Sequence, residues 1–116
     1  MEIVRFDEAV SIPISEFGSQ FKIGPLTGAD SRVRIQVMHL PPGGSIGIHP
    51  AGAKQLLAIV AGVGWAAGDD GVRRPLGPGR AAVWRLGEVH QTGTDVGLTA
   101  ICVEGEFEVQ APSDAT

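Results

Sequence analysis

The chain has 116 residues, which is the size of one domain and enough to bury one hydrophobic core. Hydrophobic residues make up 43% of it and charged residues 19%, a balance that excludes a disordered chain. The formal net charge of −4 argues against nucleic acid as a partner, because phosphate binding needs clustered lysine and arginine.

The sequence shows no secretion or membrane signal. Its first ten residues carry Glu2, Asp7 and Glu8 and no apolar run, and no stretch of about 18 apolar residues follows. The single Cys102 rules out an internal disulfide, which fits a reducing compartment. We therefore expect a cytoplasmic protein with no membrane partner.

The first third of the chain predicts short strands separated by turns. Strands are expected over 3–6 and 10–14, the second at a sheet edge because Pro13 has no amide hydrogen. Residues 18–30 are rich in glycine, proline and other turn residues and predict no regular element. The first strong strand is expected over 32–40, where side chains of opposite character alternate with a period of two.

The next strand, expected over 55–61, is apolar on both faces. If Gln55 faces the interior, then Leu56, Ala58 and Val60 face outward and need a cover. A second copy of the chain would provide that cover, so we expect a homodimer.

The last third continues the same pattern. A β-hairpin is expected where strands over 63–67 and 72–75 flank the turn 68–71, and the final strands are expected over 98–103 and 107–109. No helical periodicity of useful length occurs. Many short strands joined by glycine and proline turns predict an all-β sandwich or barrel.

A spaced set of residues that begins after the 32–40 strand and ends just past the 55–61 strand matches a known pattern. Gly43, His49 and Gly62 occupy the first glycine, the first histidine and the last glycine of G-x5-H-x-H-x3,4-E-x6-G, the first motif of the cupin superfamily. Ala51 stands where that motif has its second histidine, and Gln55 where it has its glutamate. The stretch thus resembles a cupin motif with two ligand positions changed.

A second motif follows at the spacing that this superfamily uses. In G-x5-P-x-G-x2-H-x3-N, Gly79, Gly87 and His90 match, whereas Arg85 replaces the proline and Thr94 the asparagine. The resemblance implies one cupin-type domain over residues 1–116: a double-stranded β-helix, or jelly-roll barrel, with the motif residues pointing into its mouth. Small cupins of this kind commonly dimerise through sheet faces and edges.

The resemblance also implies a candidate metal site. Metal-binding cupins hold one divalent metal with three histidines and a glutamate, and a site here would use His49, His90 and Gln55 with zinc, iron, nickel or manganese. Ala51 supplies no donor, and a neutral amide binds a dication less well than a carboxylate. Glu88 is an alternative carboxylate, since it lies two residues before His90. The other interpretation makes both histidines polar groups of a pocket that binds no metal, with Glu88 in a solvated loop.

Three further side chains have open roles. Trp65 and Trp84 are candidates for the wall of a ligand pocket, although packing between the sheets is the commoner role for such side chains. His39, at the end of the 32–40 strand, fits a position at the surface or the edge of the core.

Three functions remain open at this stage. The first is a pocket that binds a small organic ligand through His49, Gln55 and His90, with the tryptophans as walls. The second is a metal-dependent dioxygenase or isomerase that uses the two histidines. The third is a non-catalytic dimeric sensor or accessory module.

Overall fold

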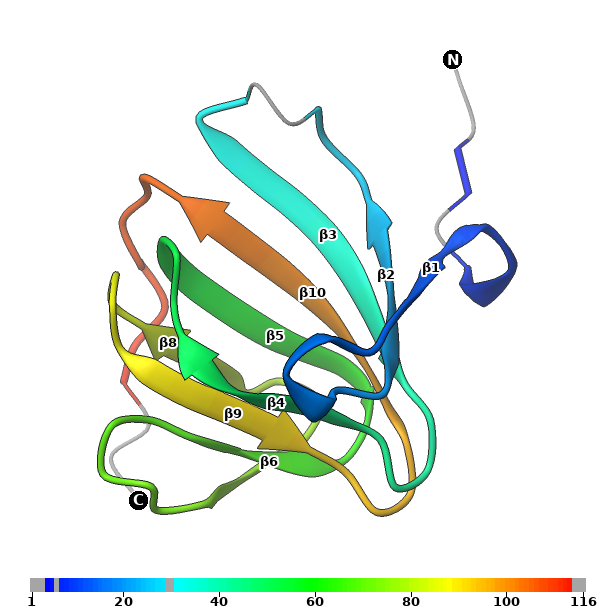
Figure 1. Ribbon diagram of the computed structural model, residues 1–116. Coiled ribbons are helices and arrows are strands. Elements are labelled where there is room, and N and C mark those ends of the chain that lie inside the picture. Colours follow the sequence, from blue (N-terminus) through cyan, green and yellow to red (C-terminus); the bar gives the residue numbers. More distant parts are fainter. Residues whose placement is uncertain (1–3, 6, 29–30, 114–116) are drawn as a thin grey trace.

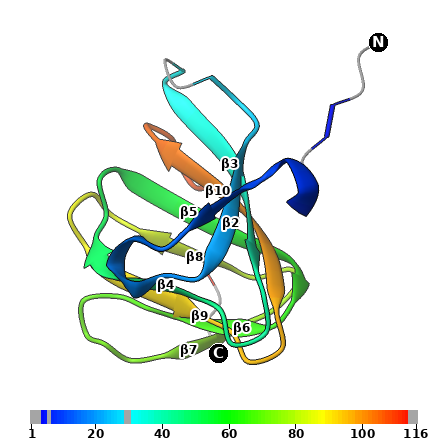
Figure 2. The same cartoon turned by 45° about the vertical axis from the view of Figure 1, so that its right-hand side comes forward.

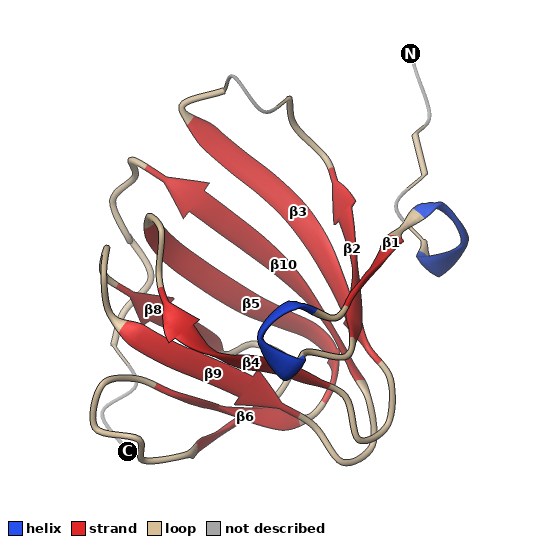
Figure 3. Ribbon diagram, in the orientation of Figure 1, coloured by secondary structure: helices blue, strands red, loops and turns tan. Residues whose placement is uncertain are grey.

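The structure of the protein is a computed structural model, and it describes residues 4–5, 7–28 and 31–113. Over these residues it is built from strands in two sheets that face each other, with two short 3-10 turns, η1 (Glu8–Val10) and η2 (Glu16–Gly18) (Figures 1 and 3). No α-helix occurs in this part of the chain, and none of its helical turns could span a membrane. The expected all-β class is confirmed.

Both sheets are antiparallel at every pairing. The larger sheet has the order β1-β2-β3-β10-β5-β8, with β1 (Ile12–Ile14), β2 (Phe21–Pro25), β3 (Val33–Leu40), β10 (Leu98–Gly105), β5 (Lys54–Gly62) and β8 (Ala81–Trp84). The smaller sheet has the order β4-β9-β6-β7, with β4 (Ser45–Pro50), β9 (Val89–Gly93), β6 (Gly64–Ala67) and β7 (Arg74–Leu76).

The two sheets enclose the core between their inner faces (Figure 2). Side chains alternate across the sheet with a period of two, so each strand contributes every second residue to the interior. On β5 these residues are Leu57 and Ile59, which are 1% and 3% exposed, and on β10 they are Leu98, Ala100 and Cys102. Burial of these apolar side chains is the main force that holds the sheets together.

Three strand predictions need correction. Residues 21–25, expected to be irregular, form β2, because Phe21 and Ile23 alternate with polar or small residues and face the core cluster. Residues 107–109 form no strand, since the chain leaves the sheet after Gly105. The strand expected over 10–14 is shorter, because Val10 belongs to η1 and Ser11 ends that turn.

Other predictions are confirmed. The hairpin around 68–71 pairs β6 with β7, and Pro13 lies in β1, at the edge of the larger sheet. The strand expected over 3–6 falls partly outside the described residues.

The outer face of the larger sheet is apolar, as the parity of β5 predicted. Leu56 and Ala58 are half-buried on it, and Ile101 and Val103 of β10 lie opposite them in register. The N-terminal segment covers part of this face: a Cβ on Gly24 would lie 2.8 Å from Ser11 Oγ. The remaining part is only partly covered: Val83, the cross-strand partner of Leu56, is 43% exposed.

Candidate functional site

A cavity of about 180 Å³ lies between the two sheets, close to η2. Most of its wall is apolar, and a smaller set of polar side chains meets there. The apolar walls come from Ile14, Phe17, Phe21, Ile23, Met38, Ile46, Leu57 and Trp84, and the polar lining from Glu16, Ser19, His49, Gln55, His90, Thr92 and Glu104. Apolar walls with a few polar groups are typical of sites that bind small molecules.

His49 and His90 lie side by side in this cavity. They are cross-strand partners on β4 and β9, and their ring centroids are 4.5 Å apart. His49 Nδ1 lies 2.6 Å from the carbonyl oxygen of Gly47, and His90 Nδ1 lies 3.2 Å from that of Glu88. A carbonyl oxygen only accepts, so each Nδ1 carries the hydrogen. Each Nε2, on the far side of the ring, is left for a ligand.

His90 is held in its neutral form. Its side chain is buried, and burial lowers its pKa from the usual value more than the hydrogen bond to the Glu88 carbonyl oxygen raises it. At neutral pH the Nε2 of His90 is therefore a hydrogen-bond acceptor.

Gln55 contacts a carboxylate that was not anticipated. Its Nε2 donates a hydrogen bond to Glu104 Oε1 at 3.1 Å, because β5 and β10 pair Gln55 with Glu104 in register. The Cys102 thiol lies on the same face, with its Sγ 3.7 Å from that oxygen. Burial raises the pKa of Cys102, and the nearby Glu104 raises it further. The thiol thus stays protonated and can donate to the carboxylate.

Two aromatic rings flank the histidine pair. Trp84 is buried, with its ring centroid 4.6 Å from that of His90, and its Nε1 donates to the carbonyl oxygen of Ala67. Phe17 stacks flat on His49, with centroids 4.4 Å apart and an interplanar angle of 2°. Phe17 is 61% exposed, so it lies at the mouth of the cavity rather than inside it.

The other two candidates from this part of the sequence lie elsewhere. Trp65 does not line the cavity; its ring packs against Gly93 and carries the Arg73 guanidinium 3.8 Å above it. Glu88 also lies outside, where its carboxylate accepts from the backbone N–H of Arg85 at 3.2 Å and faces a separate groove lined by Asp69.

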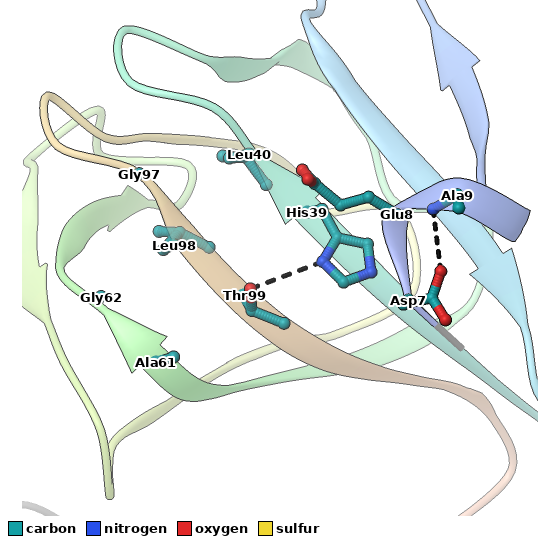
Figure 4. A pocket seen from close by; sticks show the side chains of 10 residues that line it. All are labelled: Asp7, Glu8, Ala9, His39, Leu40, Ala61, Gly62, Gly97, Leu98 and Thr99. Carbon is teal, nitrogen blue, oxygen red and sulfur yellow. Dashed lines mark hydrogen bonds between the residues drawn. The ribbon is translucent and has the colours of Figure 1, made fainter. Parts of the chain in front are cut away.

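His39 lies on the outer face, in a depression of about 560 Å³ between η1 and the ends of β3, β5 and β10 (Figure 4). Its Nδ1 is 3.5 Å from Thr99 Oγ1, and Asp7 and Glu8 line the same depression. This position at the margin of the sheet agrees with the sequence.

The residues present do not fit a metal centre of the kind that the cupin pattern implies. No group of three or more His, Cys, Asp or Glu side chains gathers to hold an ion anywhere in the described ranges. Ala51 has no donor atom and does not line the cavity, and Gln55, whose amide nitrogen donates to Glu104, offers only a neutral carbonyl oxygen. Glu104 lines the cavity without forming such a group with the two histidines. Two imidazoles and a neutral amide oxygen would hold a dication weakly.

Sequence reasoning missed Glu104, Glu16 and Phe17. Glu104 had a signal: the alternation that places Ala100 and Cys102 inward, extended by one more step, reaches it. A carboxylate on the inner face of an apolar strand needs a partner or a role. The sequence carries no such signal for Phe17 and Glu16, because η2 reaches the cavity only through tertiary packing against β4.

Several solved structures share this fold. A cupin 2 conserved barrel domain protein from Salinispora arenicola has a TM-score of 0.73 and 21% identity, covering 91% of this chain and 89% of its own. A predicted oxalate decarboxylase from Thermotoga maritima has a TM-score of 0.79 and 23% identity, covering 91% and 100%. An RmlC-like cupin family protein from Methanocaldococcus jannaschii has a TM-score of 0.69 and 14% identity, covering 90% of each chain.

No protein-family model matches the sequence, and no curated protein resembles it significantly. The structural matches nevertheless agree with both sequence motifs. The protein has the cupin fold, a double-stranded β-helix.

Proposed function

We propose that the protein binds a small organic molecule in the cavity between its sheets. The observation that carries the proposal is the composition of this cavity: aromatic and aliphatic walls around His49, His90, Gln55 and Glu104. Such walls exclude water and strengthen the few polar contacts that orient a ligand.

The size of the cavity limits the ligand. A cavity of 150 Å³ in another protein holds benzene. The 180 Å³ here suits one ring or a short branched chain with one or two further heavy atoms. Sugars attached to nucleotides and other extended ligands would have to leave most of their surface outside.

The cavity gives less support to a metal-dependent enzyme. The tautomer of both histidines suits a metal ligand, since ligating imidazoles usually donate their other N–H to a carbonyl or carboxylate. Within the described ranges no third histidine, cysteine or carboxylate gathers with the two imidazoles, and this weighs against the function.

A titration with a library of small fragments, followed by NMR of the backbone amides, tests the proposal. We expect some fragments to shift the amides of Met38, Leu57 and Thr92, and we expect His49→Ala to weaken their binding about tenfold, the effect of one polar contact. His39→Ala is the matched control, because that histidine lies on the outer face. Fragments that bind only elsewhere, or equally to both variants, would contradict the proposal.

A further inference from the structure

The cavity carries negative charge without a compensating cation. Two carboxylates, Glu16 and Glu104, line it, and no Lys or Arg does so among the described residues. Arg34 is the cross-strand partner of Glu104, but it is exposed and no ion pair joins the two side chains in the described ranges. An anionic ligand would therefore meet repulsion, and a cationic one attraction.

The hydrogen-bonding groups of the cavity favour a ligand that donates. His90, whose burial lowers its pKa and whose Nδ1–H faces the Glu88 carbonyl oxygen, offers its Nε2 as an acceptor. Gln55 has turned its amide nitrogen to Glu104, which leaves its carbonyl oxygen as a further acceptor. A ligand with several N–H donors satisfies more of these groups than one with acceptors.

Glu104 is the one of the two carboxylates that can hold a charge away from water. It is half-buried, whereas Glu16 is exposed beside the mouth. Gln55 and Cys102 both donate to its Oε1, so its orientation is fixed and its Oε2 is left for another donor. A charge-assisted hydrogen bond at such a position is about twice as strong as one between neutral groups.

The aromatic side chains fit the same class of ligand. Trp84 lines the cavity beside His90, and Phe17 stacks on His49 at its mouth. The negative faces of such rings attract organic cations as well as apolar groups.

We propose that the ligand of this cavity is a small organic cation: a primary or secondary ammonium on an apolar body about the size of a benzene ring. The ammonium donates to Glu104, to the Gln55 carbonyl oxygen and to His90 Nε2, and the body packs against Trp84 and the aliphatic wall. This inference rests on the proposed function, because it assigns the chemical class of the molecule bound at that site.

Three probes of nearly the same shape test the assignment on the unaltered protein: benzylamine, benzyl alcohol and benzoate. At pH 7 they carry a positive charge, no charge and a negative charge. Binding is measured from the NMR shifts of the backbone amides of Met38, Leu57 and Thr92. Benzylamine should bind at least about tenfold more tightly than benzyl alcohol, which is the effect of one charge-assisted hydrogen bond. Benzoate should bind most weakly, and added salt should reduce the difference.

A variant locates the charge. Glu104→Gln should weaken the binding of benzylamine about tenfold and leave the affinity for benzyl alcohol unchanged. Glu106→Gln removes the same charge from an exposed position paired with Arg32, and it should leave both affinities unchanged. The comparison of probes on the unaltered protein stands even if Glu104→Gln does not fold.

The outcomes separate the two proposals. If benzyl alcohol or benzoate shifts the cavity amides as strongly as benzylamine, the cavity binds ligands but the assignment to cations is wrong. If benzylamine binds equally well to Glu104→Gln and the parent, the assignment is also wrong. If no probe and no library fragment shifts the cavity amides, the proposed function fails and this inference fails with it.

Discussion

At the scale of single residues, His90 shows how position in the fold changes chemistry. Its ring lies between Trp84 and His49, and it is only 3% exposed. Charging it would cost desolvation free energy, which is why its pKa falls below the usual 6.5. The unfolded chain binds the proton more readily than the folded one. Folding stability is therefore linked to the protonation of this residue.

The linkage predicts the sign of a pH effect. The contribution that neutral His90 makes to the free energy of unfolding is fully present above pH 6.5. It is lost as pH falls from 6.5 through the lowered pKa of this residue in the folded state. As pH is lowered from 7.5 to 5, the melting temperature of His90→Gln should fall less steeply than that of the parent protein. His39→Gln, altered on the outer face, should keep the parent slope. Equal slopes for His90→Gln and the parent would contradict the prediction.

At the scale of elements, η2 closes one side of the cavity by packing against β4. The contact is close because Gly47 has no side chain: a Cβ there would overlap the carbonyl oxygen of Phe17. Ser19 Oγ also accepts from the Gly47 N–H at 2.9 Å. Phe17 itself has φ 59° and ψ 26°, a left-handed conformation that is costly for a residue other than glycine. The turn is thus held in place by β4, and Phe17 is positioned over His49.

Gly47→Ala should therefore destabilise the protein and displace Phe17. Overpacking of this kind costs about 1–3 kcal/mol, and for a domain of this size each kcal/mol lowers the melting temperature by about 4–8 °C. Gly52→Ala is the matched control, because nothing lies within 4 Å of its added methyl group. Calorimetry measures both variants. A Gly47→Ala protein as stable as Gly52→Ala would show that η2 is not packed as described.

At the scale of the whole molecule, the uncovered part of the outer face suggests assembly. The face is apolar around the half-buried Leu56, Ala58, Ile101 and Val103, and Val83, opposite Leu56, is 43% exposed. Exposed apolar surface of this kind marks contact sites. We propose that two copies of the chain pack through it. The N-terminal segment reduces the area left for a partner, because Val37 beneath Ser11 is already fully buried.

Light scattering after size exclusion tests the assembly. At about 10 μM and above, the parent should have the mass of a dimer, because burying the apolar face against a second copy is favourable in free energy. Ile101→Lys places a charge at the centre of the face and should give a monomer. Val96→Lys changes an exposed valine in the loop before β10 and should remain a dimer. A parent that elutes as a monomer would contradict the proposal.

The sequence by itself determined the fold and part of the cavity. Period-two alternation depends only on neighbouring residues, and it was enough to identify β3, whereas short apolar runs between turn residues identified β5 and most of β10. The spacing of Gly43, His49 and Gly62, and of Gly79, Gly87 and His90, carried the cupin resemblance.

Only the tertiary structure decided which carboxylate lies in the cavity. Glu88 is close to His90 along the chain, but the turn at Gly87, with φ 85°, leads it toward Arg85 and Asp69. Glu104 is distant along the chain, yet the register of β5 with β10 places it opposite Gln55. Register is set by packing of the whole inner face, because a slip of one residue would turn every side chain to the other side. Alternation along β10 turns Glu104 to the inner face, but it does not say which residue of β5 lies opposite. The partners of Gln55 and His49 therefore became visible only once the strands were paired.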